Sequence, residues 1–212
     1  MGSYVIIEGR GESGAVENLL RQVSARLDRH DVFWKVASRT NALKQRGQLV
    51  AQCERLRARG DCERALLLQD DEDGCPRMDG PEMASWVAAL ALPFPVAVVL
   101  FYREYETLFL PCLHGMVGKP MRDANGIDLA PLGEGARFDG DPESVRDAKK
   151  VINRFLPARR PYKPTTHQLA MTRLLDLDVL ASPQGAPCYG TLERALRFVF
   201  TANSGVYPPP PL

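Results

Sequence analysis

The stretch ALLLQDDEDG, residues 65–74, joins an apolar run to a turn of four consecutive acidic residues. The run from Ala65 to Gln69 shows no alternation of apolar and polar residues, which is typical of a strand buried on both faces. The acidic residues follow at once, so their carboxylates should lie where the strand ends. This stretch therefore predicts a central strand of a sheet with an acidic edge.

Three more apolar runs have strand character, and amphipathic segments separate all four runs. The other strands are expected at residues 4–7, 32–37 and 95–101. Apolar residues at helical spacing predict three helices between these strands. The first begins near Ser13, the second ends near Gly60, and the third has Pro81 in its first turn. The alternation of strand and helix predicts an α/β fold, a TOPRIM/Rossmann-like three-layer sandwich with a mostly parallel sheet.

The second half of the chain changes character. Residues 115–140 are rich in glycine, proline and aspartate, which predicts a long loop, and helical patterns then resume. We therefore expect a helical C-terminal extension. The predicted division is a TOPRIM-like α/β core at 1–112, a loop and helical extension packed on the core at 113–205, and a proline-rich tail at 206–212.

The composition excludes several classes of protein. The 212 residues are 45% hydrophobic and 25% charged with a net charge of +1, so no global field would hold nucleic acid or an anionic membrane. Prolines break the longest apolar stretch and no signal peptide is visible, which predicts a cytoplasmic protein without membrane contact. Five cysteines without a C-x-x-C pair and three scattered histidines make a zinc ribbon or disulfide frame improbable.

Carboxylates follow three of the four predicted strands: Glu8 and Glu12, residues 70–73, and Glu104 with Glu106. Strand ends of a parallel sheet meet at one edge, where crowded carboxylates repel one another unless a cation neutralises them. Without a histidine or cysteine cluster, that cation would be Mg²⁺ or Mn²⁺. The bland alternative for any one carboxylate is solvent exposure or helix capping. On the repulsion argument, the change Asp71→Ala is expected to leave thermal stability equal or higher.

Basic residues offer candidate contacts to phosphate. Arg10, in the turn between Glu8 and Glu12, could contact phosphate or pair with one of those glutamates. Lys149 and Lys163 could approach a metal-bound phosphate from the opposite side, or lie on a solvated helix face.

Four motifs together resemble the DUF4276 family, an uncharacterised TOPRIM-like group. They are Glu8-Gly9-x-x-Glu12, the acidic turn ahead of Cys75-Pro76, the segment FYREYETLFL at 101–110, and Tyr162-Lys163-Pro164-x-Thr166-His167-Gln168. TOPRIM folds carry a glutamate after the first strand and an Asp-x-Asp pair after a later one, and use them to hold Mg²⁺ against nucleic-acid phosphates. Glu8 matches that glutamate, while the pair falls on Asp71 and Asp73 or, in another register, on Asp70 and Glu72.

The resemblance implies a Mg²⁺-dependent phosphodiester hydrolase, a nuclease acting on nucleic acid in bacterial anti-phage defence beside a partner ATPase. The alternative is a non-catalytic TOPRIM-derived module that regulates or docks onto such an ATPase. The predicted metal ligands are Glu8, Glu12, Asp70, Asp71, Asp73 and Glu104. The predicted catalytic residues are Glu8, Asp71, Asp73 and Lys163. The predicted phosphate contacts are Arg10, Lys149 and Lys163.

Overall fold

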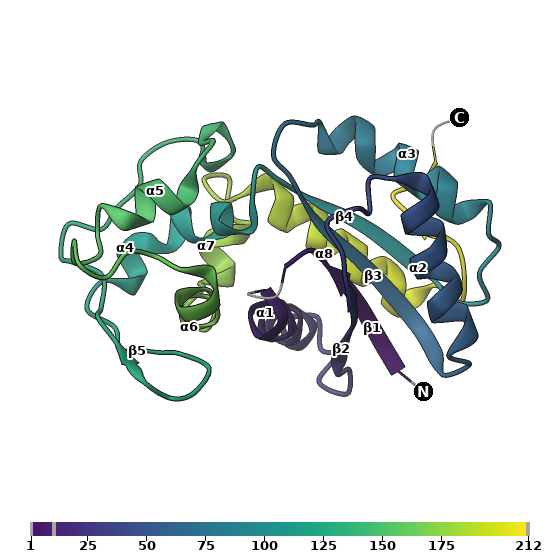
Figure 1. The fold of residues 1–212 in the computed structure, drawn as a ribbon, viewed down its shortest axis with the longest axis horizontal. Helices are drawn as coiled ribbons and strands as arrows, with labels where there is room; N and C mark the ends of the chain where they lie inside the picture. Colours follow the sequence, from purple (N-terminus) through teal and green to yellow (C-terminus); the bar gives the residue numbers. More distant parts are fainter. Residues whose placement is uncertain (1, 10–11, 211–212) are drawn as a thin grey trace.

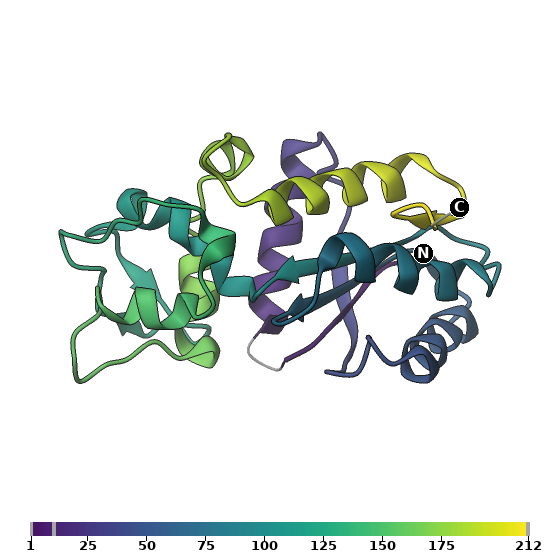
Figure 2. The ribbon, with the colours of Figure 1, turned by 90° about the horizontal axis from the view of Figure 1, so that it is seen from above.

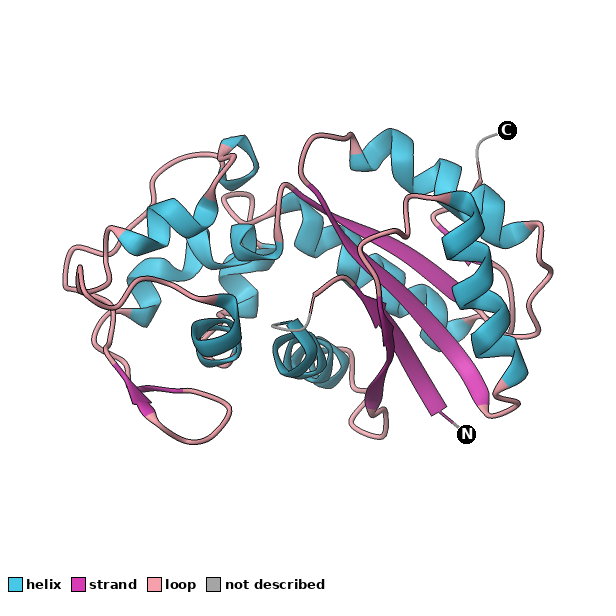
Figure 3. Ribbon diagram, in the orientation of Figure 1, coloured by secondary structure: helices cyan, strands magenta, loops and turns pink. Residues whose placement is uncertain are grey.

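A parallel five-stranded sheet in the order β2-β1-β3-β4-β7 forms the centre of one of two lobes (Figures 1 and 3). This computed structural model describes residues 2–9 and 12–210. The strands are β1 (Gly2–Ile7), β2 (Trp34–Arg39), β3 (Cys62–Asp71), β4 (Val96–Tyr102) and β7 (Val206–Tyr207). Strand β2 lies on one side of β1, and β3 and β4 follow on the other side. The strand order therefore reverses between β1 and β3.

Helices cover both faces of the sheet, which confirms the three-layer α/β prediction (Figure 2). One face packs against α1 (Glu12–Arg26) and α8 (Pro187–Thr201), and the other against α2 (Arg46–Ala58) and α3 (Pro76–Ala88). Side chains alternate between the two cores, so Val5 joins the first core and Ile6 the second. Strands buried on both sides need continuous apolar sequence, as β1, β3 and β4 have, whereas in the edge strand β2 only Trp34 is buried.

The second lobe is built from short elements between β4 and α8 (Figure 1). In chain order these are η1 (Tyr105–Cys112), α4 (Leu113–Met116), β5 (Met121–Arg122), β6 (Asp128–Leu129), η2 (Pro142–Ser144), α5 (Ala148–Asn153), η3 (Pro164–Gln168), α6 (Leu169–Thr172) and α7 (Leu177–Ala181). The two short strands β5 and β6 form an antiparallel pair. A single continuous hydrophobic cluster joins this lobe to the α1 and α8 face of the sheet.

Two details differ from the sequence-based expectation. Val206 and Tyr207 are not part of a tail, because they pair with Val96 and Ala97 at the edge of the main sheet. Gly205 makes this return possible: its φ of +98° is favourable only for glycine, and its carbonyl accepts a hydrogen bond from the Val96 N–H. Helix α3 begins at Pro76, so Pro81 lies inside the helix and not in its first turn.

In the part of the chain that the structure describes, no helix is both long and apolar enough to span a bilayer.

Candidate active site at the carboxyl edge of the sheet

The Glu8 side chain contacts the Asp70 backbone where the strand order reverses. Glu8 directly follows β1, Asp70 is the penultimate residue of β3, and both are half-buried. The backbone N–H of Asp70 donates a hydrogen bond to Glu8 Oε2 at 3.3 Å. In open parallel sheets, ligands bind in the crevice outside the carboxyl ends of the strands at this type of reversal. The sequence thus brings two predicted metal ligands to the favoured position.

Asp71 belongs to a different group of charges. Because consecutive strand residues face opposite sides of a sheet, Asp71 lies on the α2 and α3 face and Asp70 on the other. Lys44 Nζ lies 2.5 Å from Asp71 Oδ1 and 2.7 Å from Asp79 Oδ2. Burial alone would lower the pKa of Lys44, but the two carboxylates outweigh burial and raise it. Asp71 is therefore neutralised by a lysine of its own chain.

Gly74 is required by this ion-pair group. A Cβ atom built on Gly74 would overlap Asp71 Oδ1, Asp79 Oδ2 and Lys44 Nζ. Only a residue without a side chain lets the turn after β3 close over the three charged groups.

A second buried group of charges links β4 to the other lobe. Glu104 Oε1 accepts hydrogen bonds from the backbone N–H groups of Ala148 at 2.6 Å and Lys149 at 3.2 Å, at the start of α5. Lys149 Nζ forms an ion pair with Glu104 and lies 3.5 Å from Glu106 Oε2. Tyr162 donates a hydrogen bond of 2.9 Å from its hydroxyl to Glu106 Oε1. The two buried carboxylates therefore share one half-exposed lysine, and Glu106 also accepts from the Tyr162 phenol.

The pKa shifts show how these groups are coupled. Burial raises the pKa of Glu106, and Lys149 opposes that effect only in part. Burial would lower the pKa of Lys149, but Glu106, Glu104 and Asp70 together raise it. Burial and the neighbouring Glu106 carboxylate raise the pKa of Tyr162, which keeps its hydroxyl a donor. Lys149 thus stays charged, and the negative charge of Asp70 contributes to its raised pKa.

A cavity of about 310 Å³ opens beside this group. It is lined by Glu72, Asp73, Arg103, Glu104, Arg146, Asp147 and Lys149. Asp73 is exposed and forms an ion pair of 3.1 Å with Arg146, while Arg103 donates to the carbonyl of Glu72 at 2.6 Å. Three basic and four acidic residues therefore line a space large enough for a phosphate group.

The structure separates several residues that the sequence grouped together. Asp71 is paired with Lys44 and Asp73 with Arg146, and within residues 2–9 and 12–210 no three histidine, cysteine or acidic residues are placed to hold a metal ion. Arg10 and the side chain of Glu12 lie outside the described residues.

Lys163 is placed differently from its expected position. It is exposed, and its backbone N–H donates to His167 Nδ1 at 3.1 Å. Lys149 and Lys44 are the lysines that pair with carboxylates at the acidic edge.

Sequence reasoning missed Lys44, Asp79 and the role of Tyr162. The available signal for Lys44 was its position, since it lies in the loop that follows β2 at the same edge as the acidic turn. Asp79 and Tyr162 gave no comparable signal, because each comes from an element whose contact with the edge depends on packing.

Comparison with known proteins identifies the family and nothing finer. A family model described as a domain of unknown function, DUF4276, matches residues 7–196. Neither the search of curated proteins nor that of solved structures found a match. The family match covers well over half of the chain, including both lobes and the carboxyl edge of the sheet. The chain therefore belongs to the DUF4276 family.

Proposed function

We propose that this protein is a Mg²⁺-dependent phosphodiester hydrolase that cleaves nucleic acid at the carboxyl edge of its sheet. The observation that carries the proposal is the contact between Glu8 and the Asp70 backbone at the strand-order reversal. Mg²⁺ is commonly bound by one or two protein carboxylates, with water and substrate phosphate as its other ligands. Glu8 and Asp70 are the proposed pair.

The neighbouring basic residues supply the rest of the proposed site. Lys149, Arg146 and Arg103 line the cavity together with Glu104 and three other acidic residues, and these three cations would contact a phosphate bound there. Lys149 is held between Glu104 and Glu106, so its position is fixed before substrate binds. A bound Mg²⁺ would supply an activated water and stabilise the leaving oxygen. The side chains of the chain itself orient the phosphate and balance its charge.

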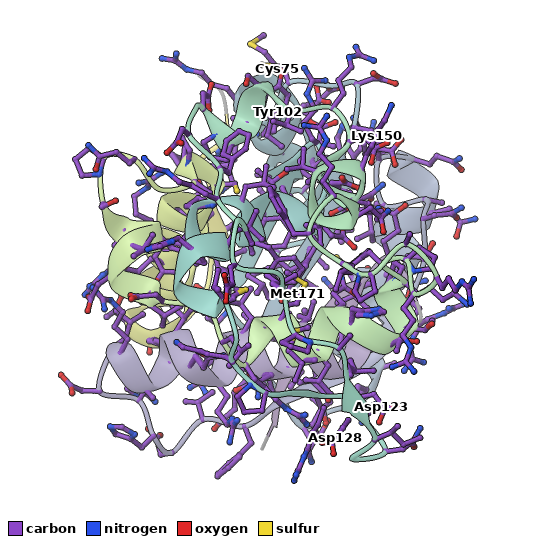
Figure 4. All side chains as sticks on the ribbon, turned by 90° about the vertical axis from the view of Figure 1, so that its left-hand side faces the viewer. Cys75, Tyr102, Asp123, Asp128, Lys150 and Met171 are labelled. Carbon is purple, nitrogen blue, oxygen red and sulfur yellow. The ribbon has the colours of Figure 1, made fainter. Side chains whose placement is uncertain are left out.

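Cleavage assays with single-stranded and double-stranded DNA and RNA, in Mg²⁺ or Mn²⁺, test this proposal. Glu8→Gln and Asp70→Asn should each lower the cleavage rate at least about 100-fold, while the unfolding temperature shows that each variant is folded. The matched control is Asp128→Asn, since Asp128 is 78% exposed and lies far from Lys150 in Figure 4. Metal-dependent cleavage that survives both site variants at the wild-type rate would refute the assignment.

A second candidate function is a non-catalytic module that docks onto a partner ATPase. The observation in its favour is that Asp71, Asp73 and Glu104 each already form an ion pair with a basic side chain. Titration calorimetry with Mn²⁺ separates the two candidates when combined with the cleavage assays. Mn²⁺ binding that depends on Glu8, without cleavage of any substrate alone or with an ATPase, would favour the module. The ATPase and a role in defence rest on the family resemblance alone.

A further inference from the structure

A groove of about 630 Å³ runs along the outer edge of β4, between α3 and α8. Figure 2 shows the two helices on either side of the strand. The lining is mainly apolar and includes Pro76, Pro81, Val98, Leu100, Pro187 and Pro208. Its volume lies within the range of ordinary ligand sites. The groove lies on the edge of β4 that faces away from β3 and β1. Binding in the groove is therefore independent of the proposed hydrolase activity.

The floor of the groove is a strand edge that lacks a full partner. Strand β7 pairs only with Val96 and Ala97. The Val96 N–H points outward to the Gly205 carbonyl, whereas the Arg103 N–H points inward to Asp71. Successive residues of a strand direct their backbone groups to opposite edges, so Leu100 directs its N–H and C=O outward, as Val96 does.

No strand in residues 2–9 and 12–210 pairs with Leu100 on that side, although Leu100 is only 3% exposed. A sheltered backbone donor and acceptor without a strand partner favour the addition of another strand.

Two helix N-termini lie at one end of the groove. Helices α3 and α8 both begin there, with Cys75 as the N-cap of α3 and Pro187 as the first residue of α8. Glu143 caps α8 by accepting from the Cys188 N–H at 2.7 Å, whereas the N-cap of α3 makes no side-chain hydrogen bond. Figure 4 shows Cys75 near Tyr102, the last residue of β4. The helix dipoles therefore favour a negative charge where β4 ends.

Arg77, in the first turn of α3, adds positive charge at this end, whereas Arg194 lies toward β7, where it contacts Tyr207. Arg77 and Arg194 line the groove, and Glu143 is the one carboxylate among its lining residues. Tyr207 and Thr191 hold the Arg194 guanidinium through hydrogen bonds of 3.1 Å and 3.0 Å. An occupant with a negative group at the α3 end would complement this arrangement.

We propose that the groove binds the carboxyl-terminal segment of a partner protein as an extra strand parallel to β4 and in line with β7. In that direction the peptide ends beside Tyr102 and the start of α3, so its terminal carboxylate meets Arg77 and the helix N-terminus. The edge from Val98 to Tyr102 spans roughly 13 Å, enough for about four residues. A small anion would leave the Leu100 backbone without a partner, whereas a peptide main chain pairs with it.

Selection from a library of random hexapeptides with free carboxyl termini tests the proposal on the full chain. Gly80, which lines the groove on α3, offers a matched pair of variants. A Cβ at Gly80 meets Pro208 Cγ at 3.7 Å, an ordinary contact, so Gly80→Ala should keep peptide binding while Gly80→Phe fills the groove and abolishes it. Amidation of the selected peptides should weaken binding at least about tenfold, because the charge-assisted contacts at the carboxylate are lost.

Hydrogen exchange gives an independent readout. Bound peptide should slow exchange of the Leu100 amide, which a purely side-chain interaction would not do. If Gly80→Phe does not fold, Arg77→Glu serves as the second variant, with the same expected loss of peptide binding.

Three results would overturn the proposal: selected peptides that bind Gly80→Phe or Arg77→Glu as well as wild type, equal binding of amidated peptides, or unchanged exchange at Leu100. A fourth result would also overturn it and assign the groove to a small molecule. In this case no peptide is selected, but the anionic dye anilinonaphthalene sulfonate binds to wild type and not to Gly80→Phe.

Discussion

Replacing Lys44 with methionine removes the basic partner from a buried carboxylate. The Asp71 side chain is 0% exposed, its Oδ1 is paired with Lys44, and its Oδ2 has no hydrogen-bond partner within the described chain. Removal of one partner from a buried ion pair costs about 3–5 kcal/mol, because the remaining charge stays out of water. We expect Lys44→Met to lower the free energy of unfolding by this amount.

The reverse truncation should cost less. Lys44 is 37% exposed and keeps Asp79 as a partner when Asp71 is removed, so Asp71→Ala should destabilise the protein by about 1–3 kcal/mol. This reverses the expectation from sequence, which assumed crowded carboxylates and predicted equal or higher stability. The ion pair with Lys44 replaces repulsion by attraction.

Urea unfolding followed by circular dichroism measures these changes, and a double-mutant cycle isolates the interaction. The double variant Lys44→Met/Asp71→Ala has no buried unpaired charge, so it should be more stable than Lys44→Met by at least about 1 kcal/mol. The control Lys35→Met changes an exposed lysine of β2 and should stay within about 0.5 kcal/mol of wild type. A Lys44→Met variant as stable as this control, or additive effects in the cycle, would refute the reasoning.

Three further predictions concern the same edge. Gly74→Ala should cost about 1–3 kcal/mol by forcing the charged groups apart, whereas Gly47→Ala, with open space around its Cβ, should be neutral or stabilising in parallel urea titrations. Tyr162→Phe should cost about 1–3 kcal/mol by depriving buried Glu106 of its donor, and a thermal midpoint equal to wild type would contradict this. Burial raises the pKa of Glu106 above 4.5, so the folded state binds the Glu106 proton more tightly than the unfolded state does. The stability that this proton contributes is lost as the pH rises through the folded pKa, and Glu106→Gln should therefore gain stability relative to wild type as the pH rises from 4.5. A constant difference between the two proteins from pH 4 to pH 7 would exclude this mechanism.

The layers of the fold could be predicted from the sequence because they depend on local patterns. Apolar runs without alternation identified β1, β3 and β4, and helical spacing identified the helices that cover them. The position of β7 could not be predicted in the same way. Two residues, Val206 and Tyr207, carry no periodicity, and their partner strand lies about a hundred positions earlier in the chain. Pairing over such a separation is decided by how α8 packs and where Gly205 turns the chain.

The site was predictable to the level of the sheet edge and no further. Acidic residues at neighbouring strand ends do lie at one edge, and the Glu8 side chain contacts the Asp70 backbone there. Which face each side chain takes depends on the residue at which the strand ends, and a shift of one residue reverses the face. Strand β3 continues through Asp71, so alternation sends Asp70 and Asp71 to opposite sides. The predicted pair of Asp71 and Asp73 is divided by its ion-pair partners, since Asp71 binds Lys44 and Asp73 binds Arg146.

Two lysines organise the charges of this edge, and their placement limits where a metal ion could bind. Lys44 neutralises Asp71 on the face covered by α2 and α3, and Lys149 neutralises Glu104 beside the second lobe. A metal ion at either place would have to displace a lysine that already sits between carboxylates, at a cost in electrostatic energy. Glu8 and Asp70 lie at the strand-order reversal, and the field of Asp70 reaches Lys149. Glu104 and Glu106 contribute more than Asp70 to the raised pKa of Lys149, so cation binding at Asp70 would leave this lysine in its place beside the cavity, ready to contact a phosphate.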